Sequence, residues 1–145
     1  MTNIGILAID DDPDALDEIK RAIQATEAAK NTEYKLFMAE DELINDLSED
    51  IHLYIVDHFL TNRTGLDVLK LIKNKNPGSY VIGYSGIKDG DVLIKYIKAK
   101  IDDWVDKSKF DGRFNDLVKA IDDGMDIAKA RVDLYNRATH NQQKK

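Results

Sequence analysis

Five polar residues with the chemistry to bind metal or phosphate stand at the ends of short apolar runs in this sequence. Asp10 and Asp11 follow the first run, Asp57 follows the third, Ser85 follows the fourth, and Lys107 follows the fifth. Carboxylates held within a few ångströms repel one another, and a divalent cation removes that conflict. Because Mg²⁺ prefers oxygen ligands from one or two carboxylates, with waters and a phosphate, these acids are candidate metal ligands.

The same residues have the chemistry for transfer of a phosphoryl group. An aspartate such as Asp57 can act as a nucleophile and form an acyl phosphate. The ammonium of Lys107 would supply a positive charge for phosphate oxygens, and the hydroxyl of Ser85 could donate a hydrogen bond to another. Phosphoryl transfer needs mainly positioning and neutralisation of charge, which these groups would provide together.

Strand-like and helix-like segments alternate along the chain and predict how these residues are positioned. Short apolar segments typical of strands cover residues 4–9, 34–39, 53–56, 80–84 and 102–106. Apolar residues at helical spacing predict helices at residues 13–30, 40–48, 64–76 and 89–100 and from about residue 112 onward. Such alternation is typical of the α/β class, in which helices cover both faces of a parallel sheet.

The doubly wound, flavodoxin-like strand order 2-1-3-4-5 is the leading topology for five such units. Ligands of these sheets bind outside the carboxyl ends of the strands, at the switch point between strands one and three. Asp10, Asp11 and Asp57 are therefore expected to meet there, with Ser85 and Lys107 on neighbouring strands of the same edge. Asp12, which precedes Pro13, is expected to cap the first helix instead.

Composition narrows the class of protein. The 145 residues suffice for one compact domain, and the net charge of −6 argues against direct binding to nucleic acid. The absence of cysteine excludes disulfides, zinc–thiolate sites and a catalytic thiol, and it fits a reducing cytoplasm. The start of the chain has neither the basic region of a signal peptide nor a membrane-spanning segment. A cytoplasmic protein that does not enter the membrane is expected.

Four segments of the sequence resemble the receiver domain of two-component response regulators. They read ILAIDDDPDAL, LYIVDHFLTNRTGLDVLKLI, VIGYSG and AKIDDWVDKSKF, and the resemblance covers roughly residues 4–123. It implies a phosphorylation-dependent signalling switch, not an enzyme, in which Asp57 accepts a phosphoryl group from a phosphohistidine. The donor would be a sensor histidine kinase or a histidine phosphotransfer protein.

The resemblance also implies roles for the remaining site residues. Asp11 would bind Mg²⁺ or Mn²⁺ directly, Asp10 would act mostly through water, and the Phe59 carbonyl would be a further ligand beside Asp57. Lys107 would hold the acyl phosphate, and Ser85 would move to meet it. Trp104, three residues before Lys107, occupies the place of a switching aromatic that is usually tyrosine or phenylalanine. His58 is expected near the rim of the pocket.

The chain departs from the family pattern at several positions. Thr61 and Thr64 stand where the family usually has proline and aspartate, and Ser108 replaces the proline that usually follows the lysine. A trans Lys107–Ser108 peptide bond is expected, because a cis bond without proline costs about 3 kcal/mol. Lys100 must either leave the left-handed conformation of the family's glycine or tolerate its strain.

Two alternative functions come from other classes of protein. Phosphatases and mutases with an aspartyl nucleophile need a second aspartate two residues later as general acid, and Phe59 cannot transfer a proton. A pseudo-receiver would signal by protein binding without phosphorylation. The intact set of acids, with Ser85 and Lys107, argues against that alternative.

The C-terminal helix is expected to extend beyond the receiver domain. From residue 113 to about residue 138 apolar residues recur at heptad spacing, at Phe114, Val118, Ile121, Met125, Ala128, Val132 and Tyr135. Strands of ordinary length would cover this helix only through about Ile121. A receiver domain at residues 1–123 and an extension at residues 124–145 are therefore predicted.

The extension is expected to expose Met125, Val132 and Tyr135, with any kink at Gly124. Because an isolated projecting helix is marginal in water, a homodimer through this half is predicted, or a helix leading to an output domain. A frayed tail, or one that folds back, is the alternative.

Overall fold

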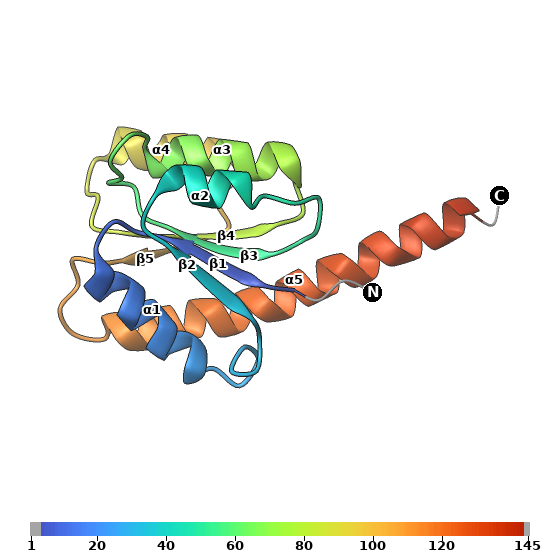
Figure 1. The fold of residues 1–145 in the computed structure, drawn as a ribbon, viewed down its shortest axis with the longest axis horizontal. Helices are drawn as coiled ribbons and strands as arrows, with labels where there is room; N and C mark the ends of the chain where they lie inside the picture. The colour runs from blue at the N-terminus through green and yellow to red at the C-terminus, as the bar shows by residue number, and fades with distance from the viewer. Residues whose placement is uncertain (1–3, 144–145) are drawn as a thin grey trace.

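The computed structural model describes residues 4–143 and shows five strands alternating with five helices (Figure 1). The strands are β1 (Ile6–Ile9), β2 (Tyr34–Phe37), β3 (Leu53–Val56), β4 (Tyr80–Ser85) and β5 (Asp103–Asp106). The helices are α1 (Pro13–Gln24), α2 (Glu40–Asn45), α3 (Gly65–Lys75), α4 (Gly90–Lys98) and α5 (Arg113–Gln143). The predicted elements are all present, and several are shorter than the sequence suggests.

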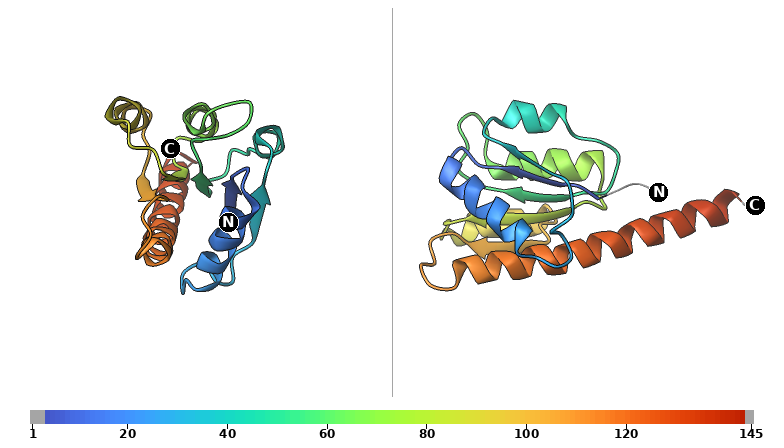
Figure 2. Two further views of the ribbon diagram at one scale, coloured as in Figure 1. Left: turned by 90° about the vertical axis from the view of Figure 1, so that its left-hand side faces the viewer. Right: turned by 60° about the horizontal axis from the view of Figure 1, so that its bottom comes forward.

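The strands form one parallel sheet in the order β2-β1-β3-β4-β5, as predicted. Helices α1 and α5 cover one face, and α2, α3 and α4 cover the other (Figures 1 and 2). Each face encloses its own apolar cluster, so β1, β3 and β4 are buried on both sides. That burial explains why their sequences are continuous apolar runs rather than alternating ones.

Capping residues fix where the helices near the site begin. The Asp12 side chain accepts a hydrogen bond from the Asp14 amide at 3.0 Å, which confirms its predicted role as the cap of α1. Thr64 and Asp67 form a reciprocal capping box at the start of α3. Helix α1 ends at Gln24 rather than at residue 30, with Ala25 as its C-cap and turns in the residues that follow.

Helix α5 is as long as predicted, but more of it packs on the domain. Met125 and Val132 are buried, with Ala128 between them, in the same core cluster as residues of β3 and β4, so the prediction that they project into solvent is wrong. A Cβ at Gly124 would lie 2.7 Å from Tyr80 Cε1, so glycine there allows a close approach of α5 to the sheet. The helix is continuous through Gly124.

Beyond Val132 the expected projection is observed. Tyr135 is 66% exposed and Leu134 is 64% exposed. Figure 2 shows the end of α5 running past the sheet. No helix within the described residues is both long and apolar enough to cross a bilayer. The boundary predicted between residues 123 and 124 stays a prediction, although the packing of α5 carries the core across it.

The structure shows the backbone conformation at two positions where the sequence departs from the family pattern, Lys100 and Ser108. Lys100 adopts a left-handed conformation with φ of 73°, so it tolerates the conformation that glycine would take more easily. Within residues 4–143 no peptide bond is cis, which agrees with the predicted trans bond between Lys107 and Ser108.

Candidate functional site

The sheet register brings the three predicted acids together. Ile9 pairs with Val56, so the residues that follow these two, Asp10 and Asp57, leave adjacent strands at the same edge. One carboxylate oxygen from each of Asp10, Asp11 and Asp57 lies within 4.8 Å of the others. Asp10 and Asp57 are buried and Asp11 is exposed, so this acidic pocket opens to solvent on the Asp11 side.

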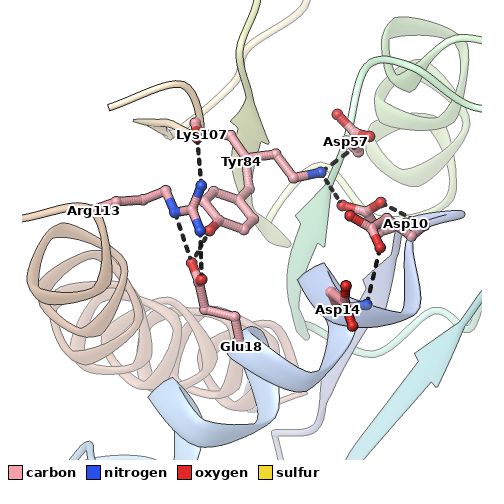
Figure 3. Close-up of polar contacts among 8 residues, drawn as sticks. Asp10, Asp14, Glu18, Asp57, Tyr84, Lys107 and Arg113 are labelled. Carbon is pink, nitrogen blue, oxygen red and sulfur yellow. Dashed lines mark hydrogen bonds and ion pairs between the residues drawn. The ribbon is translucent and has the colours of Figure 1, made fainter. Parts of the chain in front are cut away.

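Lys107 reaches into the acidic pocket from the end of β5 (Figure 3). Its Nζ lies 2.5 Å from Asp10 Oδ2 and 3.4 Å from Asp57 Oδ2. Burial by itself would lower the pKa of this lysine, but the hydrogen bond and negative charge of Asp10, with the charge of Asp57, raise it. The ammonium therefore stays charged and neutralises only part of the negative charge of three carboxylates.

Burial and like charge act together on Asp10. Desolvation raises its pKa above the ordinary value, the Asp57 charge adds to that effect, and hydrogen bonds from Lys107 and the Asp12 amide oppose it. The carboxylate–carboxylate repulsion that the sequence predicted is thus present in the folded chain.

Two buried polar atoms at the acidic pocket have no hydrogen-bond partner among the described residues. They are Asp57 Oδ1 and Ser85 Oγ. Leaving such a group unpaired costs about 1–3 kcal/mol, so native proteins rarely keep one without a function. A cation bound to Asp57 Oδ1 and a phosphoryl oxygen bonded to Ser85 Oγ would satisfy these two atoms. The pocket therefore fits a cation and a phosphoryl group.

Phe59 lies in the loop that follows β3, where its backbone pairs with Thr64 in an isolated bridge. Its side chain is 61% exposed. The loop is held by Glu40, whose Oε1 accepts hydrogen bonds from the Asn62 amide at 2.8 Å and the Arg63 amide at 3.4 Å. The role of the Phe59 carbonyl as a metal ligand stays a prediction.

Trp104 packs in an aromatic cluster on the α4 side of the sheet. Its ring lies so close over Gly83 that a Cβ there would be 2.2 Å from Trp104 Cε3. The ring also meets Tyr96 edge-on, with 4.9 Å between centroids, and the Tyr96 hydroxyl bonds His58 Nδ1 at 2.5 Å. His58 is therefore half-buried beside the acidic pocket, and the switching role of Trp104 stays a prediction.

Sequence reasoning missed four polar residues that support the acidic pocket. Glu40 holds the loop after Asp57, whereas Glu18, Tyr84 and Arg113 form a connected group behind Lys107 (Figure 3). The helical acids among them look like ordinary solvated or dipole-stabilising residues in the sequence. Only the burial of Glu40, which is 3% exposed, distinguishes it from its neighbours.

Comparison with known proteins identifies the same class of domain. Residues 6–122 match the family described as "Response regulator receiver domain". A receiver domain protein of the CheY-like kind from Methanospirillum hungatei JF-1 superposes with a TM-score of 0.75 at 20% identity, covering 89% of this chain and 98% of that one. The "BeF3 Activated DrrB Receiver Domain" gives 0.72 at 22% identity, over 86% and 99% of the two chains.

A curated relative is longer than this chain. A cyclic di-GMP phosphodiesterase from Thermotoga maritima is 32% identical over 62 residues, which are 43% of this chain and only 17% of that protein. The structural neighbours share the five-stranded fold, and the family match spans most of the sequence, including the two strands that precede Asp10 and Asp57. This chain belongs to the response regulator receiver domain family.

Proposed function

We propose that this chain is a signalling switch in which Asp57 accepts a phosphoryl group from the phosphohistidine of a sensor histidine kinase or a histidine phosphotransfer protein. Receiver domains generally act as phosphorylation-dependent switches and are regulatory rather than catalytic. The observation that carries the proposal is the acidic pocket itself. Three carboxylates meet there, Lys107 pairs with two of them, Asp10 and Asp57, and Asp57 Oδ1 is left without a partner among the described residues.

The same pocket fits a divalent cation, Mg²⁺ or Mn²⁺. Asp10, Asp11 and Asp57, with the Phe59 carbonyl, would hold it, Asp10 mostly through water. The fit rests on the carboxylate oxygens within 4.8 Å of one another and on their unrelieved repulsion. When bound, such an ion neutralises charge on the transferring phosphoryl group and on the acids around it.

The side chains of this chain would perform the rest of the transfer. An Asp57 carboxylate oxygen attacks phosphorus, an O–P bond forms, and the electron pair of the broken P–N bond leaves on the donor imidazole. The Lys107 ammonium, already beside Asp57, binds one phosphoryl oxygen. The unpaired Ser85 hydroxyl donates to another oxygen and thereby gains the partner it lacks.

Phosphorylation by a small donor tests this function directly. With acetyl phosphate and Mg²⁺, the intact mass of the chain should rise by one phosphoryl group, and Asp57→Asn should prevent the rise. A wild-type chain that stays unmodified while its fold is intact would favour the pseudo-receiver alternative. Fragment masses would show whether the modification lies on Asp57.

The remaining expectations about partners and location belong to this proposal. The net charge of −6 supports a protein partner rather than nucleic acid. A cytoplasmic location and the absence of membrane association follow from the same role as the target of a sensor kinase. The predicted homodimer through the C-terminal helix would have to use the exposed end of α5, because Met125 and Val132 are buried within the domain.

A further inference from the structure

A chain of polar contacts lies on the side of Lys107 that faces away from the carboxylates (Figure 3). Arg113, the first residue of α5, donates a hydrogen bond from Nη1 to the main-chain carbonyl of Lys107 at 2.7 Å. The rest of its guanidinium donates two hydrogen bonds to Glu18 on α1, from Nε to Oε1 at 3.0 Å and from Nη2 to Oε2 at 2.7 Å. The hydroxyl of Tyr84 on β4 also donates to Glu18. We call these three residues the Arg113 clamp.

Contacts with Ser85, Arg113 and Tyr84 hold the main chain and the side chain of Lys107. The Lys107 amide donates to the Ser85 carbonyl at 3.1 Å, and Arg113 binds the carbonyl on the other side of the same residue. The Lys107 ammonium lies 5.4 Å from the centroid of the Tyr84 ring, so the side chain extends past that ring toward the acidic pocket. The position of the Lys107 backbone is thus set by Ser85 and Arg113, and the direction of its side chain follows the Tyr84 ring.

The charges of the Arg113 clamp are balanced within it. Burial favours the protonated form of Glu18, but hydrogen bonds from Arg113 and Tyr84 outweigh it and hold the pKa of this carboxyl below its usual range. Both carboxylate oxygens of Glu18 are occupied by Arg113. Fork-to-fork pairs of this kind fix geometry more tightly than a lysine could, because guanidinium and carboxylate are both planar.

A cleft beside Lys107 contains carboxylates that could pair with its ammonium if Arg113 were absent. The cleft, of about 250 Å³, is lined by Lys107 and Arg113 together with the acids Asp12, Asp14 and Glu18. Without Arg113, Glu18 would lose its hydrogen-bonded counter-charge, keep only the charge of Arg21, and compete with Asp10 and Asp57 for the Lys107 ammonium. The loop between β5 and α5 would also lose a hydrogen bond to a main-chain carbonyl, at a place where Ser108 provides no ring to stiffen it.

We propose that Arg113 and Glu18 are positioning residues for the phosphoryl transfer, which they influence by holding Lys107 in reach of the phosphoryl group. The proposal rests on the function proposed above, because it concerns the lysine that binds the acyl phosphate. Tyr84 supports it by orienting Glu18 and by guiding the lysine side chain. The Arg113 clamp also links α1 to the acidic pocket, so a change at α1 has a direct path to Lys107.

Removal of Arg113 should slow phosphorylation. Arg113→Met should reduce the rate with acetyl phosphate and Mg²⁺ by about tenfold, since a displacement of about 1 Å can cost up to 100-fold. Arg113→Lys should recover only part of the rate, because one ammonium cannot bind Glu18 and the Lys107 carbonyl in the same fork. In a Lys107→Met background, Arg113→Met should add no further loss, because the clamp would have no lysine left to position.

Arg131→Met is the matched control. Arg131 is also on α5 and also pairs with a partly buried carboxylate, at 2.9 Å from Asp102, but it lies at the opposite edge of the sheet. Both variants should lower the thermal midpoint of unfolding, and only Arg113→Met should slow phosphorylation of the folded chain. Equal rates in wild type and Arg113→Met, or equal slowing by Arg131→Met, would overturn the positioning role.

A second readout needs neither metal nor phosphoryl donor. The Lys107 amine should react with an amine-acylating reagent at a different rate in Arg113→Met than in wild type, because loss of Arg113 changes which carboxylates pair with its ammonium, and the mass of the peptide that contains it measures that rate. Arg131→Met should leave that reaction unchanged. If the wild-type chain takes no phosphoryl group, the proposed function fails while this measurement still judges the clamp. Unchanged reactivity of Lys107 in Arg113→Met would refute it.

Discussion

Two lysine–aspartate clusters lie at opposite ends of the strands of the same sheet. One lies where the strands begin, here called the amino edge, and the other where they end, here called the carboxyl edge. The clusters differ in how completely their charged groups are paired. At the amino edge, Asp102 Oδ2 accepts from Lys73 Nζ at 2.7 Å and from the Val81 amide at 2.8 Å, while Oδ1 accepts from Arg131 at 2.9 Å. One carboxylate there serves two cations. In the acidic pocket at the carboxyl edge, three carboxylates lie together, and the ammonium of Lys107 pairs with two of them, Asp10 and Asp57.

The difference separates a fully paired cluster from the incompletely paired one for which we propose the phosphoryl chemistry. The amino-edge cluster ties α3, α5 and β4 together, and both oxygens of Asp102 are hydrogen-bonded. The acidic pocket keeps excess negative charge and two unpaired buried atoms among the described residues, Asp57 Oδ1 and Ser85 Oγ. Residue types alone do not distinguish the two regions, whereas the balance of charge and hydrogen bonds does.

The largest expected effect is loss of metal-dependent phosphorylation in Asp11→Ala. Asp11 is the exposed member of the three acids, so its removal should leave the fold intact while taking away a direct metal ligand. Phosphorylation by acetyl phosphate in Mg²⁺ should become undetectable by intact mass. Asp102→Asn provides the contrast, with an unchanged rate for each folded molecule. Normal Mg²⁺-dependent phosphorylation of Asp11→Ala would show that Asp11 is not a ligand.

The second prediction concerns stability, where the two clusters should respond with opposite signs. Asp102→Asn should destabilise the chain by about 3 kcal/mol, because breaking a buried ion pair leaves an uncompensated charge on Lys73. Asp57→Asn should stabilise the metal-free chain by about 1 kcal/mol, because it relieves repulsion with Asp10. Urea unfolding in the presence of a chelator measures both changes. A loss of stability in Asp57→Asn would contradict the excess charge inferred for the acidic pocket.

Much of this contrast was available from the sequence, and part of it was not. The five strands, their order and the meeting of Asp10, Asp11 and Asp57 follow from apolar periodicity and from the rule that parallel strands end at one edge. The Arg113–Glu18 pair joins residues 95 positions apart, and the Arg131–Asp102 pair joins residues 29 apart. Single charged residues on helices give no local signal of such partners.

The prediction that α5 projects from the domain after Ile121 was wrong for a physical reason. The heptad seam through Met125 and Val132 is real, but it faces this domain rather than a second chain. The length of α5 that the domain covers was predicted from strand length alone. Ala29 and Ile51, which lie outside the strands, also belong to the core cluster that covers α5. Periodicity locates an apolar face and does not say which surface covers it.

The third prediction concerns the lifetime of the acyl phosphate. Phe59 and Ile87 come two residues after Asp57 and Ser85, and neither side chain can orient a water for in-line attack. Slow self-dephosphorylation is therefore expected, and Phe59→Asn should accelerate it roughly tenfold by supplying a group that can hold a water. Phe110→Asn is the matched control, since Phe110 is a 98% exposed phenylalanine in the loop after β5. A lifetime that stays the same or grows in Phe59→Asn would count against this role.

The smallest expected effect lies beyond the amino-edge cluster, at the end of α5. Ile127 and Leu134, exposed by 40% and 64%, are seven residues apart and so lie on one side of the helix, and Tyr135, which is 66% exposed, borders them about 100° further round. This exposed stripe replaces the buried seam as the surface for a homodimer. It is short, and interfaces well below about 1,000 Å² are weak, so a dimer is expected only at high concentration.

Sedimentation of the full chain measures this weak association, with and without phosphorylation. Leu134→Glu should shift the equilibrium to monomer, because a second copy would have to bury the new charge. Lys119→Glu is the control on the same helix, since Lys119 is exposed and lies away from the projecting end. The full chain is kept because ending it at residue 123 would remove Met125, Ala128 and Val132 from the core. Monomers at every reachable concentration, in both phosphorylation states, would eliminate the homodimer and leave the exposed stripe for a different partner.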